Sequence, residues 1–263
     1  MSQELLDYVP ATGLLQDRVI LVTGAAMGIG RAAALAYARF GATVVLLDKQ
    51  VTQLEKVYDE ITAAGWPQPA IYPLDMQGAN QDDYVALAEN IREQLGRLDG
   101  LVLNAAWLAA FMPISQHAVD LWLKMITVNL HANFLLTRAC LPLLDEAEDA
   151  AIVFSSDRSD KAYYGAFGVA KGGMNAFCDI LAQEHDNERH FIRVNRIDTG
   201  PVLSSTRVLN FPGEHPDTLV HPEQVVGPYL FYMGPDAGRR TGEALALERI
   251  APDYRWPGGR DGH

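Results

Sequence analysis

From residue 18 almost to the end of the chain, segments typical of buried β-strands alternate with segments of helical periodicity. The first strand segments are almost entirely apolar, as expected when helices cover both faces of a sheet. This alternation predicts an α/β fold of the doubly wound type, with a parallel sheet of about seven strands and helices on both faces. The strand segments are 19–23, 43–47, 70–74, 101–103, 152–155 and 192–197, and the helical segments are 29–40, 51–64, 81–95, 119–144 and 166–185.

Length and composition favour a single domain. A chain of 263 residues suits one doubly wound sheet, and no repeat or linker divides it, so we expect one domain over residues 1–263. Residues 199–222 are rich in Pro, Gly, Ser and His and interrupt the alternation, so we expect a long loop that acts as a substrate lid. The ends, 1–16 and 251–263, are expected to be irregular, with the tail either packed on a neighbouring subunit or loose.

The charge balance excludes some partners. The formal net charge of −12 repels nucleic-acid phosphates and anionic membranes, so we expect neither as a partner. No apolar run is long enough to cross a bilayer, and the first residues lack the pattern of a signal peptide. Cys140 and Cys178 have no metal or redox spacing and are expected to be buried thiols, and the histidines show no ligand spacing. These features predict a cytoplasmic protein without a metal.

The sequence VILVTGAAMGIGRAAALAYA (19–38) passes from a strand through a glycine turn into a helix. Gly24 permits a tight turn, Gly28 lets the backbone approach a pyrophosphate, and Gly30 lets the helix pack closely on the strand. The first helical N–H groups, at the positive end of the helix dipole, face the phosphates. We therefore predict a Rossmann-type domain that binds a nicotinamide dinucleotide, with an ordinary strand–helix turn as the alternative.

Two acidic residues at the ends of the next strands bear on the cofactor. Asp48 is placed to accept hydrogen bonds from the adenine-ribose hydroxyls and to repel a 2′-phosphate. Met27, just before Gly28, offers no positive charge in compensation, and Lys49 is the nearby cation. We therefore expect NAD rather than NADP. Asp75 is expected either to contact the adenine amino group or to be an ordinary acid at a helix start.

The spacing T-G-x-x-x-G-I-G from Thr23 to Gly30 resembles that of the short-chain dehydrogenase/reductase family, most closely a bacterial subgroup of undefined substrate. Nearly the whole chain takes part in the resemblance, with the further matches LDM (74–76), RLDGLVLNAA (97–106), VNL (128–130), FSS (154–156), VAKGG (169–173) and IRVNRIDTGPV (192–202). The resemblance implies an oxidoreductase with Asn129, Ser156 and Lys171 as catalytic residues. It also implies cofactor contacts from Thr23, Gly24, Met27, Gly28, Ile29, Gly30, Asp48, Asp75, Met76, Asn104 and Lys171.

One catalytic residue of the family is missing. Four residues before Lys171, where the family has a tyrosine that exchanges a proton with the substrate oxygen, this chain has Phe167. A phenyl ring has no such proton, and losing a positioned general acid typically costs about 10²–10⁴ in rate. We therefore expect impaired or altered catalysis. Tyr163 or Tyr164 could replace the tyrosine, and Asp157 or Asp160 could do so with a strongly raised pKa.

Apolar residues surround the expected substrate position. They are Trp107, Leu108, Phe111 and Met112 after the fourth strand and Val202, Leu203, Val208 and Leu209 in the presumed lid. An apolar alcohol or ketone is therefore the expected substrate, with core or subunit packing as an equal alternative. The long helical segments 119–144 and 166–185 resemble those through which the family forms homodimers and homotetramers.

Three functions remain open at this stage. The first is an NAD-dependent oxidoreductase that works slowly or with a substituted acid. The second is a catalytically silent NAD(H)-binding sensor or partner subunit, and the third is a scaffold that binds no nucleotide. The sequence does not separate the first two, because binding and proton transfer depend on different residues.

Overall fold

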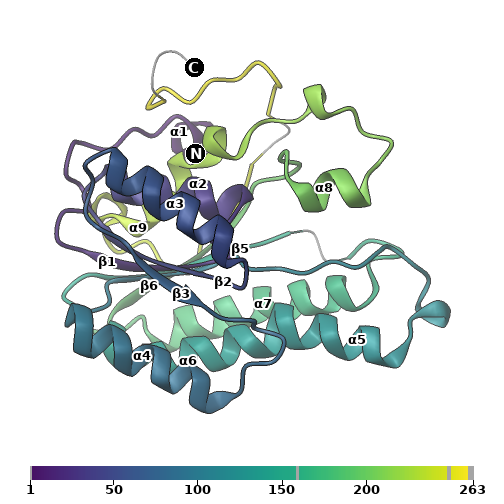
Figure 1. Ribbon diagram of the computed structural model, residues 1–263, viewed down its shortest axis with the longest axis horizontal. Helices are drawn as coiled ribbons and strands as arrows, with labels where there is room; N and C mark the ends of the chain where they lie inside the picture. The colour runs from purple at the N-terminus through teal and green to yellow at the C-terminus, as the bar shows by residue number, and fades with distance from the viewer. Residues whose placement is uncertain (1, 158–159, 248–249, 260–263) are drawn as a thin grey trace.

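The computed structural model describes residues 2–157, 160–247 and 250–259. Its centre is a seven-stranded, parallel sheet with the strand order β3-β2-β1-β4-β5-β6-β7 (Figure 1). The order reverses between β1 and β4, where this topology opens a crevice outside the strand ends. The predicted doubly wound α/β fold is confirmed. The strands are β1 (Val19–Thr23), β2 (Thr43–Asp48), β3 (Ala70–Pro73), β4 (Gly100–Leu103), β5 (Ala150–Ser155), β6 (Ile192–Asp198) and β7 (Ala244–Ala246).

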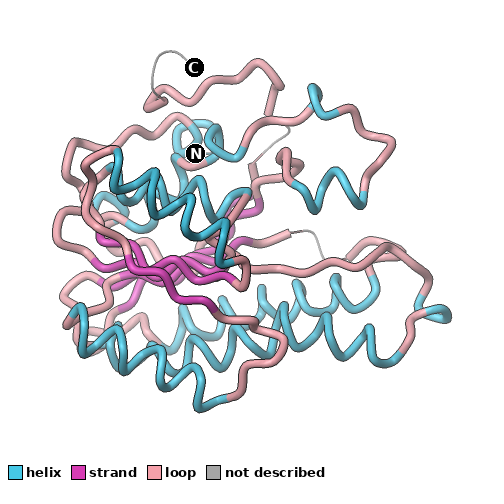
Figure 2. Tube along the Cα trace, in the orientation of Figure 1, coloured by secondary structure: helices cyan, strands magenta, loops and turns pink. Residues whose placement is uncertain are grey.

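Helices cover both faces of the sheet (Figure 2). Along β1, Ile20 and Val22 point into one core while Val19 and Leu21 point into the other, which explains why the strand is wholly apolar. One layer holds α1 (Ser2–Leu6), α2 (Gly28–Arg39), α3 (Val51–Ala63) and α9 (Gly227–Met233). The other holds α4 (Gln81–Leu95), α6 (Ala132–Asp145) and α7 (Gly165–Glu184). Beyond the strand ends, α5 (Val119–Ile126) extends the second layer and α8 (Ser205–Asn210) lies opposite it (Figure 1).

Three expectations about the elements need correction. The segment 119–144 is not one regular α-helix, because the π-helical turn Thr127–His131 separates α5 from α6. The segment 199–222 is not wholly a loop, since it contains α8 and a short 3₁₀ turn, Pro216–Thr218. The first sixteen residues are not wholly irregular, because α1 buries Leu5 and Leu6 in the core.

The C-terminal tail packs on its own chain. The Trp256 side chain is buried, and its Nε1 donates a hydrogen bond to the Tyr8 carbonyl oxygen at 2.9 Å. The Tyr254 hydroxyl donates to the Leu6 carbonyl oxygen at 3.0 Å. The expectation of a loose end is therefore wrong for residues 250–259, which pack against α1 and the residues after it in their own chain. Packing of the tail on a neighbouring subunit stays a prediction.

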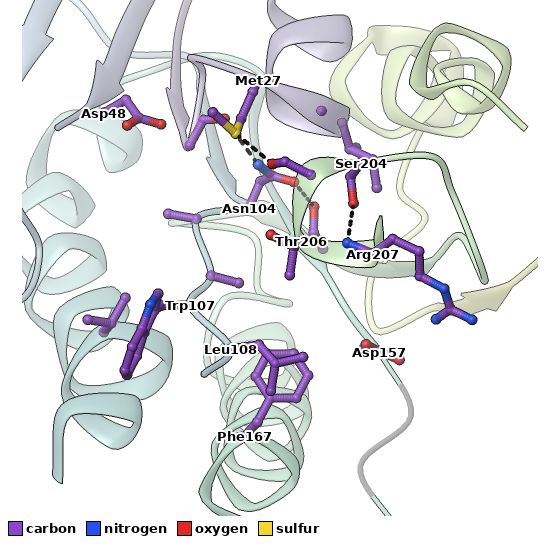
Figure 3. A pocket seen from close by; sticks show the side chains of 18 of the residues that line it. Met27, Asp48, Asn104, Trp107, Leu108, Asp157, Phe167, Ser204, Thr206 and Arg207 are labelled. Carbon is purple, nitrogen blue, oxygen red and sulfur yellow. Dashed lines mark hydrogen bonds between the residues drawn. The ribbon is translucent and has the colours of Figure 1, made fainter. Parts of the chain in front are cut away.

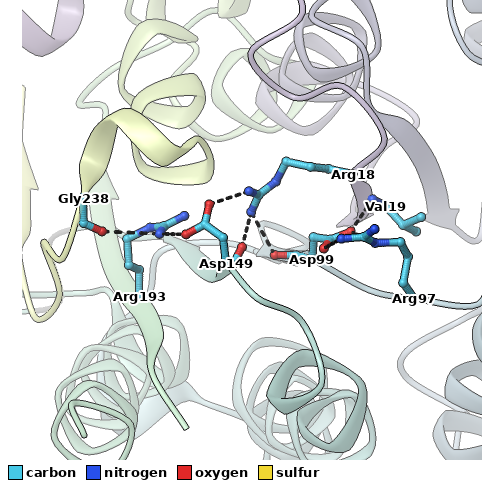
Figure 4. A network of polar contacts seen from close by, with 7 residues as sticks. All are labelled: Arg18, Val19, Arg97, Asp99, Asp149, Arg193 and Gly238. Carbon is cyan, nitrogen blue, oxygen red and sulfur yellow. Dashed lines mark hydrogen bonds and ion pairs between the residues drawn. The ribbon is translucent and has the colours of Figure 1, made fainter. Parts of the chain in front are cut away.

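A polar network ties the amino ends of the central strands together (Figure 4). Arg18, before β1, donates to the Asp149 carboxylate at 2.5 Å, and Arg193 of β6 pairs with the same carboxylate from the other side. The Arg193 side chain is 2% exposed, so its charge depends on this partner. Burial alone would raise the pKa of Asp149. The positive charges and hydrogen bonds of Arg193, and to a smaller extent of Arg18, have a larger opposite effect, so the pKa of Asp149 lies below its ordinary value.

We expect Asp149→Asn to lower the free energy of unfolding by about 2–3 kcal/mol at pH 7. This loss is smaller than the ~3–5 kcal/mol that breaking a fully buried ion pair costs, because Asp149 is partly exposed. The folded-state pKa is depressed, so the carboxylate's contribution is complete above the unfolded pKa of about 4 and is lost as the pH falls through the folded value. Urea unfolding from pH 3 to pH 7 should therefore show the two proteins converging in acid.

Glu146→Gln is the matched control, because it removes a carboxylate from an ion pair with Arg92 that is exposed to solvent. We expect little change in unfolding from it. An equal loss in both variants, or a difference between Asp149→Asn and the wild type that is as large at pH 3 as at pH 7, would contradict the role of the network.

Candidate active site

A cavity of about 500 Å³ opens at the carboxyl ends of the central strands. Asp48 lies at one end, Trp107 and Phe167 lie towards the other, and α8 closes one side with Ser204, Thr206 and Arg207 (Figure 3). The predicted cofactor and catalytic residues on its wall are Gly24, Met27, Gly28, Ile29, Asp48, Asp75, Met76, Asn104, Ser156, Phe167 and Lys171. Three others, Thr23, Gly30 and Asn129, lie behind this wall and support it.

The three glycines of the turn have different structural roles. A Cβ on Gly30 would lie 2.2 Å from the Gly24 carbonyl oxygen, so Gly30 is required for α2 to start this close to β1. Gly24 has a φ of +67°, and a Cβ there would meet the Asn104 side chain at 2.9 Å. Gly28 differs, because with a φ of +58° its Cβ position would meet only Ser204 Cβ within 4 Å, at an ordinary contact distance of 3.8 Å. A side chain at residue 28 would therefore project into the cavity between the turn and α8.

The start of α2 leaves backbone N–H groups for a ligand. Met27 is the N-cap of the helix, and its side chain makes no capping hydrogen bond. The first N–H groups of this twelve-residue helix therefore face the cavity at the positive end of the helix dipole. Such a terminus suits the negative charge of a phosphate, and the lack of a side chain at Gly28 lets a phosphate approach the backbone.

Two carboxylates lie at the far end of the cavity from Phe167. Asp48 is held by the Gln50 N–H, which donates to Oδ1 at 3.0 Å, and its Oδ2 is 3.4 Å from the Ala26 nitrogen of the glycine turn. Asp75 also lines the cavity, six residues before α4 begins at Gln81. Asn80 rather than Asp75 caps α4, but Asp75 Oδ1 accepts from the Gln77 N–H at 3.1 Å in the turn that precedes the helix, so both alternatives for Asp75 stay open.

A chain of hydrogen bonds joins the floor of the cavity to α9. The Asn104 amide donates to the Thr23 carbonyl oxygen at 3.1 Å, and Ser155 Oγ donates to Asn104 Oδ1 at 3.0 Å. The Ser155 hydroxyl has a single proton, which it donates to Asn104. In the 2.8 Å hydrogen bond between Ser155 Oγ and the Tyr229 hydroxyl, Tyr229 is therefore the donor. Burial, with a smaller effect of Asp198, raises the pKa of Tyr229 well above its ordinary value, so its hydroxyl stays protonated.

Asn129 supports the loop after β4. Its Oδ1 accepts from the Trp107 N–H at 2.9 Å, and its Nδ2 donates to the carbonyl oxygens of Trp107 and Met125, each at 2.8 Å. The residue is 2% exposed and lies in the π-helical turn, where the wider backbone coil turns its side chain towards that loop. The amide is thus fully engaged in holding the Trp107 backbone.

Lys171 and Phe167 lie side by side on α7. The Lys171 Nζ donates to the Ser155 carbonyl oxygen at 2.8 Å and lies 5.7 Å from the centre of the Phe167 ring. Burial lowers the pKa of Lys171, and the nearby carboxylates of Asp157 and Asp198 offset part of this effect. Phe167 is 5% exposed and packs in an apolar cluster with Leu108 and other residues, so the ring is a firm part of the wall.

Of the remaining candidates for proton transfer, Asp157 lines the cavity and Asp160 is exposed, whereas Ser156 and the two tyrosines are turned elsewhere. Ser156 Oγ lines the cavity but donates to Asn175 Oδ1 at 2.7 Å. Tyr163, with a φ of +74°, is 61% exposed. Tyr164 is buried, with its ring centre 6.3 Å from that of Phe167, and it lines a neighbouring cavity instead. Neither tyrosine belongs to the described wall of the main cavity, so this arrangement does not support the rescue by Tyr163 or Tyr164.

The apolar residues expected around the substrate divide into two groups. Trp107, Leu108, Phe111 and Val202 line the cavity, and Phe211 of the segment after α8 joins them. Val208 and Leu209 are instead 50% and 73% exposed on α8. The segment 199–222 reaches the glycine turn, since Ser205 Oγ lies 3.1 Å from Met27 Sδ.

Comparison with known proteins identifies this arrangement. The family model for short chain dehydrogenase matches residues 18–214. The chain belongs to the short chain dehydrogenase family. The oxidoreductase YciK of Escherichia coli K12 is 37% identical over 240 residues, which cover 90% of this chain and 94% of YciK.

Solved structures agree with this assignment. A short chain dehydrogenase from Pseudomonas syringae is 41% identical with a TM-score of 0.89, covering 92% of this chain and 99% of that protein. A short chain dehydrogenase from Escherichia coli CFT073, solved in complex with NADPH, is 37% identical with a TM-score of 0.87. The match covers 91% of this chain and 100% of that protein. The expected family, its oxidoreductase class and its Rossmann-type fold are thereby confirmed for this short chain dehydrogenase.

Some site residues were not predicted from the sequence. Asp198 ends β6 and lines the cavity, and a search of each strand's carboxyl end would have found it. Lys124 and Phe211 also line the cavity, but nothing in their local sequence marks them. Among the described residues, no cluster of His, Cys, Asp or Glu could hold a metal ion. No described helix is long and apolar enough to cross a membrane.

We expect Asn129→Ala to lower the free energy of unfolding by about 3 kcal/mol, because it leaves polar groups of the Trp107 backbone buried without partners. Asn187→Ala removes an exposed amide and serves as the control. Urea unfolding followed by circular dichroism measures both. Equal unfolding midpoints for the two variants would show that Asn129 does not support the loop.

Proposed function

We propose that this short chain dehydrogenase binds a nicotinamide dinucleotide along the main cavity and exchanges a hydride with an apolar substrate by chemistry altered through Phe167. The observation that carries the proposal is the continuity of one cavity from Asp48, past the glycine turn, to Lys171. When bound, the dinucleotide would supply or take up the hydride, and the residues of the chain position it and its reaction partner.

The residues on the wall fit the parts of such a molecule. The adenosine half would lie by Asp48 and Asp75, and the pyrophosphate at the uncapped start of α2 next to Gly28. Lys171 would donate to the hydroxyls of the other ribose, a binding task that does not depend on a tyrosine. The aromatic residues beyond it, Trp107 and Phe111, would surround the substrate.

The proton step is where this site differs from the family pattern. A phenyl ring at residue 167 neither donates nor accepts a proton, and it fills its place in the wall firmly. The proposal therefore includes weak activity on ordinary alcohols and ketones. The firm packing of Phe167 also supports a second candidate, a catalytically silent dinucleotide-binding sensor or partner subunit, which predicts binding without turnover of any substrate.

The variant Phe167→Tyr tests whether the missing hydroxyl at residue 167 limits catalysis. We expect it to raise kcat for a panel of apolar ketones by about 10²–10⁴, the usual contribution of a positioned general acid, because Lys171 is still in place to lower the pKa of the new hydroxyl. Steady-state kinetics with NADH and with NADPH measure the effect. Phe167→Leu, which brings no hydroxyl, is the control, and a gain no larger than in this variant would contradict the proposal.

The choice between NAD and NADP is a separate part of the proposal. Asp48 would repel a 2′-phosphate and thus favours NAD, the cofactor expected from the sequence. The relative solved with NADPH makes NADP at least an equal candidate. Lys49, beside Asp48 on the cavity wall, is the cation that would accommodate the phosphate.

The variant Asp48→Asn tests how Asp48 affects the relative affinities for NAD and NADP. Removing a like charge from the 2′-phosphate is worth about 1–1.4 kcal/mol at contact distance, so we expect NADPH to bind about five- to tenfold more tightly to the variant. NADH should bind slightly less tightly, through a lost charge-assisted hydrogen bond. Calorimetric titrations of both cofactors measure this. Unchanged NADPH affinity would place the adenine ribose away from Asp48.

We also propose a cytoplasmic homodimer or homotetramer formed through α6 and α7. These helices carry exposed apolar side chains, among them Phe134, Val169 and Ile180, which association would cover. Sedimentation of the purified protein tests the oligomeric state, and a monomer at micromolar concentration would contradict it.

A further inference from the structure

Most polar groups at the substrate end of the main cavity already have partners within the chain. Ser155 donates to Asn104, and Ser156 donates to Asn175. Lys171 donates to the Ser155 carbonyl oxygen, and its other N–H groups are those that would contact the ribose. These groups are therefore poor candidates for binding a further part of the substrate.

Most charged side chains at this end are engaged as well. Arg207 of α8 donates two hydrogen bonds to the Glu214 carboxylate. Asp157 and Asp198 are the carboxylates whose charges act on the Lys171 ammonium, and Asp157 is engaged further within the chain. These five residues carry two positive and three negative charges, and each has a partner of opposite charge among the others.

Lys124 and Trp107 differ from these residues, because they present donors without acceptors. Lys124 of α5 is half-buried, lines the same wall and makes the positive and negative charges of this end equal in number. Its Nζ lies over the Trp107 ring, 4.2 Å from the centre, and no described residue accepts a hydrogen bond from its N–H groups or pairs with its charge. Trp107 bonds to Asn129 through its backbone, and its indole Nε1, which can only donate, also lacks an acceptor within the described part of the chain.

Asn129 fixes the backbones that carry the two donors. Its Nδ2 donates to the Trp107 carbonyl oxygen in the loop after β4 and to the carbonyl oxygen of Met125, the residue that follows Lys124 on α5. The contact of the ammonium with the indole ring also restricts the Lys124 side chain. Because the two donors are held together before a ligand arrives, the entropic cost of binding one is lowered.

We propose that the substrate is an otherwise apolar ketone that carries a carboxylate group, and that Lys124 and the Trp107 indole N–H bind this carboxylate. A carboxylate has two oxygens that accept hydrogen bonds, and its bonds to an ammonium are charge-assisted. Trp107 also packs against the apolar cluster that contains Leu108 and Phe167, which suits the hydrocarbon part of such a molecule. The inference rests on the proposed function, because the carboxylate takes no part in the hydride exchange and only positions the ketone for it.

Calorimetry on the full-length protein tests the inference, with oxidised dinucleotide present so that ketones bind without turnover. The probes are phenylglyoxylate, 4-oxo-4-phenylbutanoate and 5-oxo-5-phenylpentanoate, each compared with its neutral methyl ester. Hydrogen bonds to charged groups are the strong ones in proteins, so we expect at least one acid to bind about tenfold more tightly than its ester.

Variants of the two donors show whether they cause this difference. Lys124→Gln should weaken the acid about tenfold and leave the ester and the dinucleotide unaffected, whereas Lys124→Arg, which keeps the charge, should retain most of the affinity for the acid. Trp107→Phe, which keeps a ring but removes the N–H group, should weaken the acid about threefold. Lys56→Gln removes an exposed lysine of α3 and is the matched control, which should change neither ligand.

Three results would overturn the inference. They are equal affinities of the wild type for every acid and its ester, an equal effect of Lys124→Gln on acid and ester, and a loss of dinucleotide affinity in Lys124→Gln, which would place Lys124 at the cofactor instead. Absence of dinucleotide binding by the wild type would overturn the proposed function itself, and the same titrations measure it before any ketone is added.

Discussion

The close contact between the start of α2 and the ends of β1 and β4 sets the geometry of the whole site. Gly30 lets the helix begin against the Gly24 carbonyl group, and Asn104 fits against the same turn. Because Asn104 also accepts from Ser155, the carboxyl end of β5 is tied to this contact. A larger side chain at Gly30 would separate the helix from the sheet and disturb the cavity along its full length.

Two residues that the family resemblance predicts to be catalytic make structural hydrogen bonds here. Asn129 holds the backbone of the loop that carries Trp107, and Lys171 ties α7 to the end of β5. Both would therefore persist after the tyrosine was lost, whether or not they act on a substrate. Phe167 replaces a reactive group by an apolar one without leaving a hole, since it packs against Leu108. The wall of the cavity is thus closed at this position by an apolar side chain.

The sequence predicted the parts of the fold that have a clear local pattern. Helix α4, with its N-cap Asn80 and its C-cap Gly96, matches the predicted range, and β1 does as well. The short elements α9 and β7 were missed, because α9 is buried on all sides and has no helical periodicity, and β7 has three residues. The glycine turn was predictable because its spacing is local. The partnership of Tyr229 with Ser155 was not, since 74 residues separate them.

Dinucleotide binding at the glycine turn is the claim on which the whole account depends, and a pair of matched variants tests it most directly. Gly28 and Gly65 both have a left-handed backbone, with φ of +58° and +72°. A Cβ on Gly65 would meet nothing within 4 Å, and one on Gly28 would meet Ser204 Cβ at an ordinary contact distance of 3.8 Å, but of the two only Gly28 lines the cavity. The account predicts that wild-type protein and Gly65→Val bind NADH or NADPH in calorimetric titrations, whereas Gly28→Val, with an unchanged circular dichroism spectrum, loses at least a hundredfold in affinity. Equal affinity in the two variants, or no binding by the wild type, would contradict it.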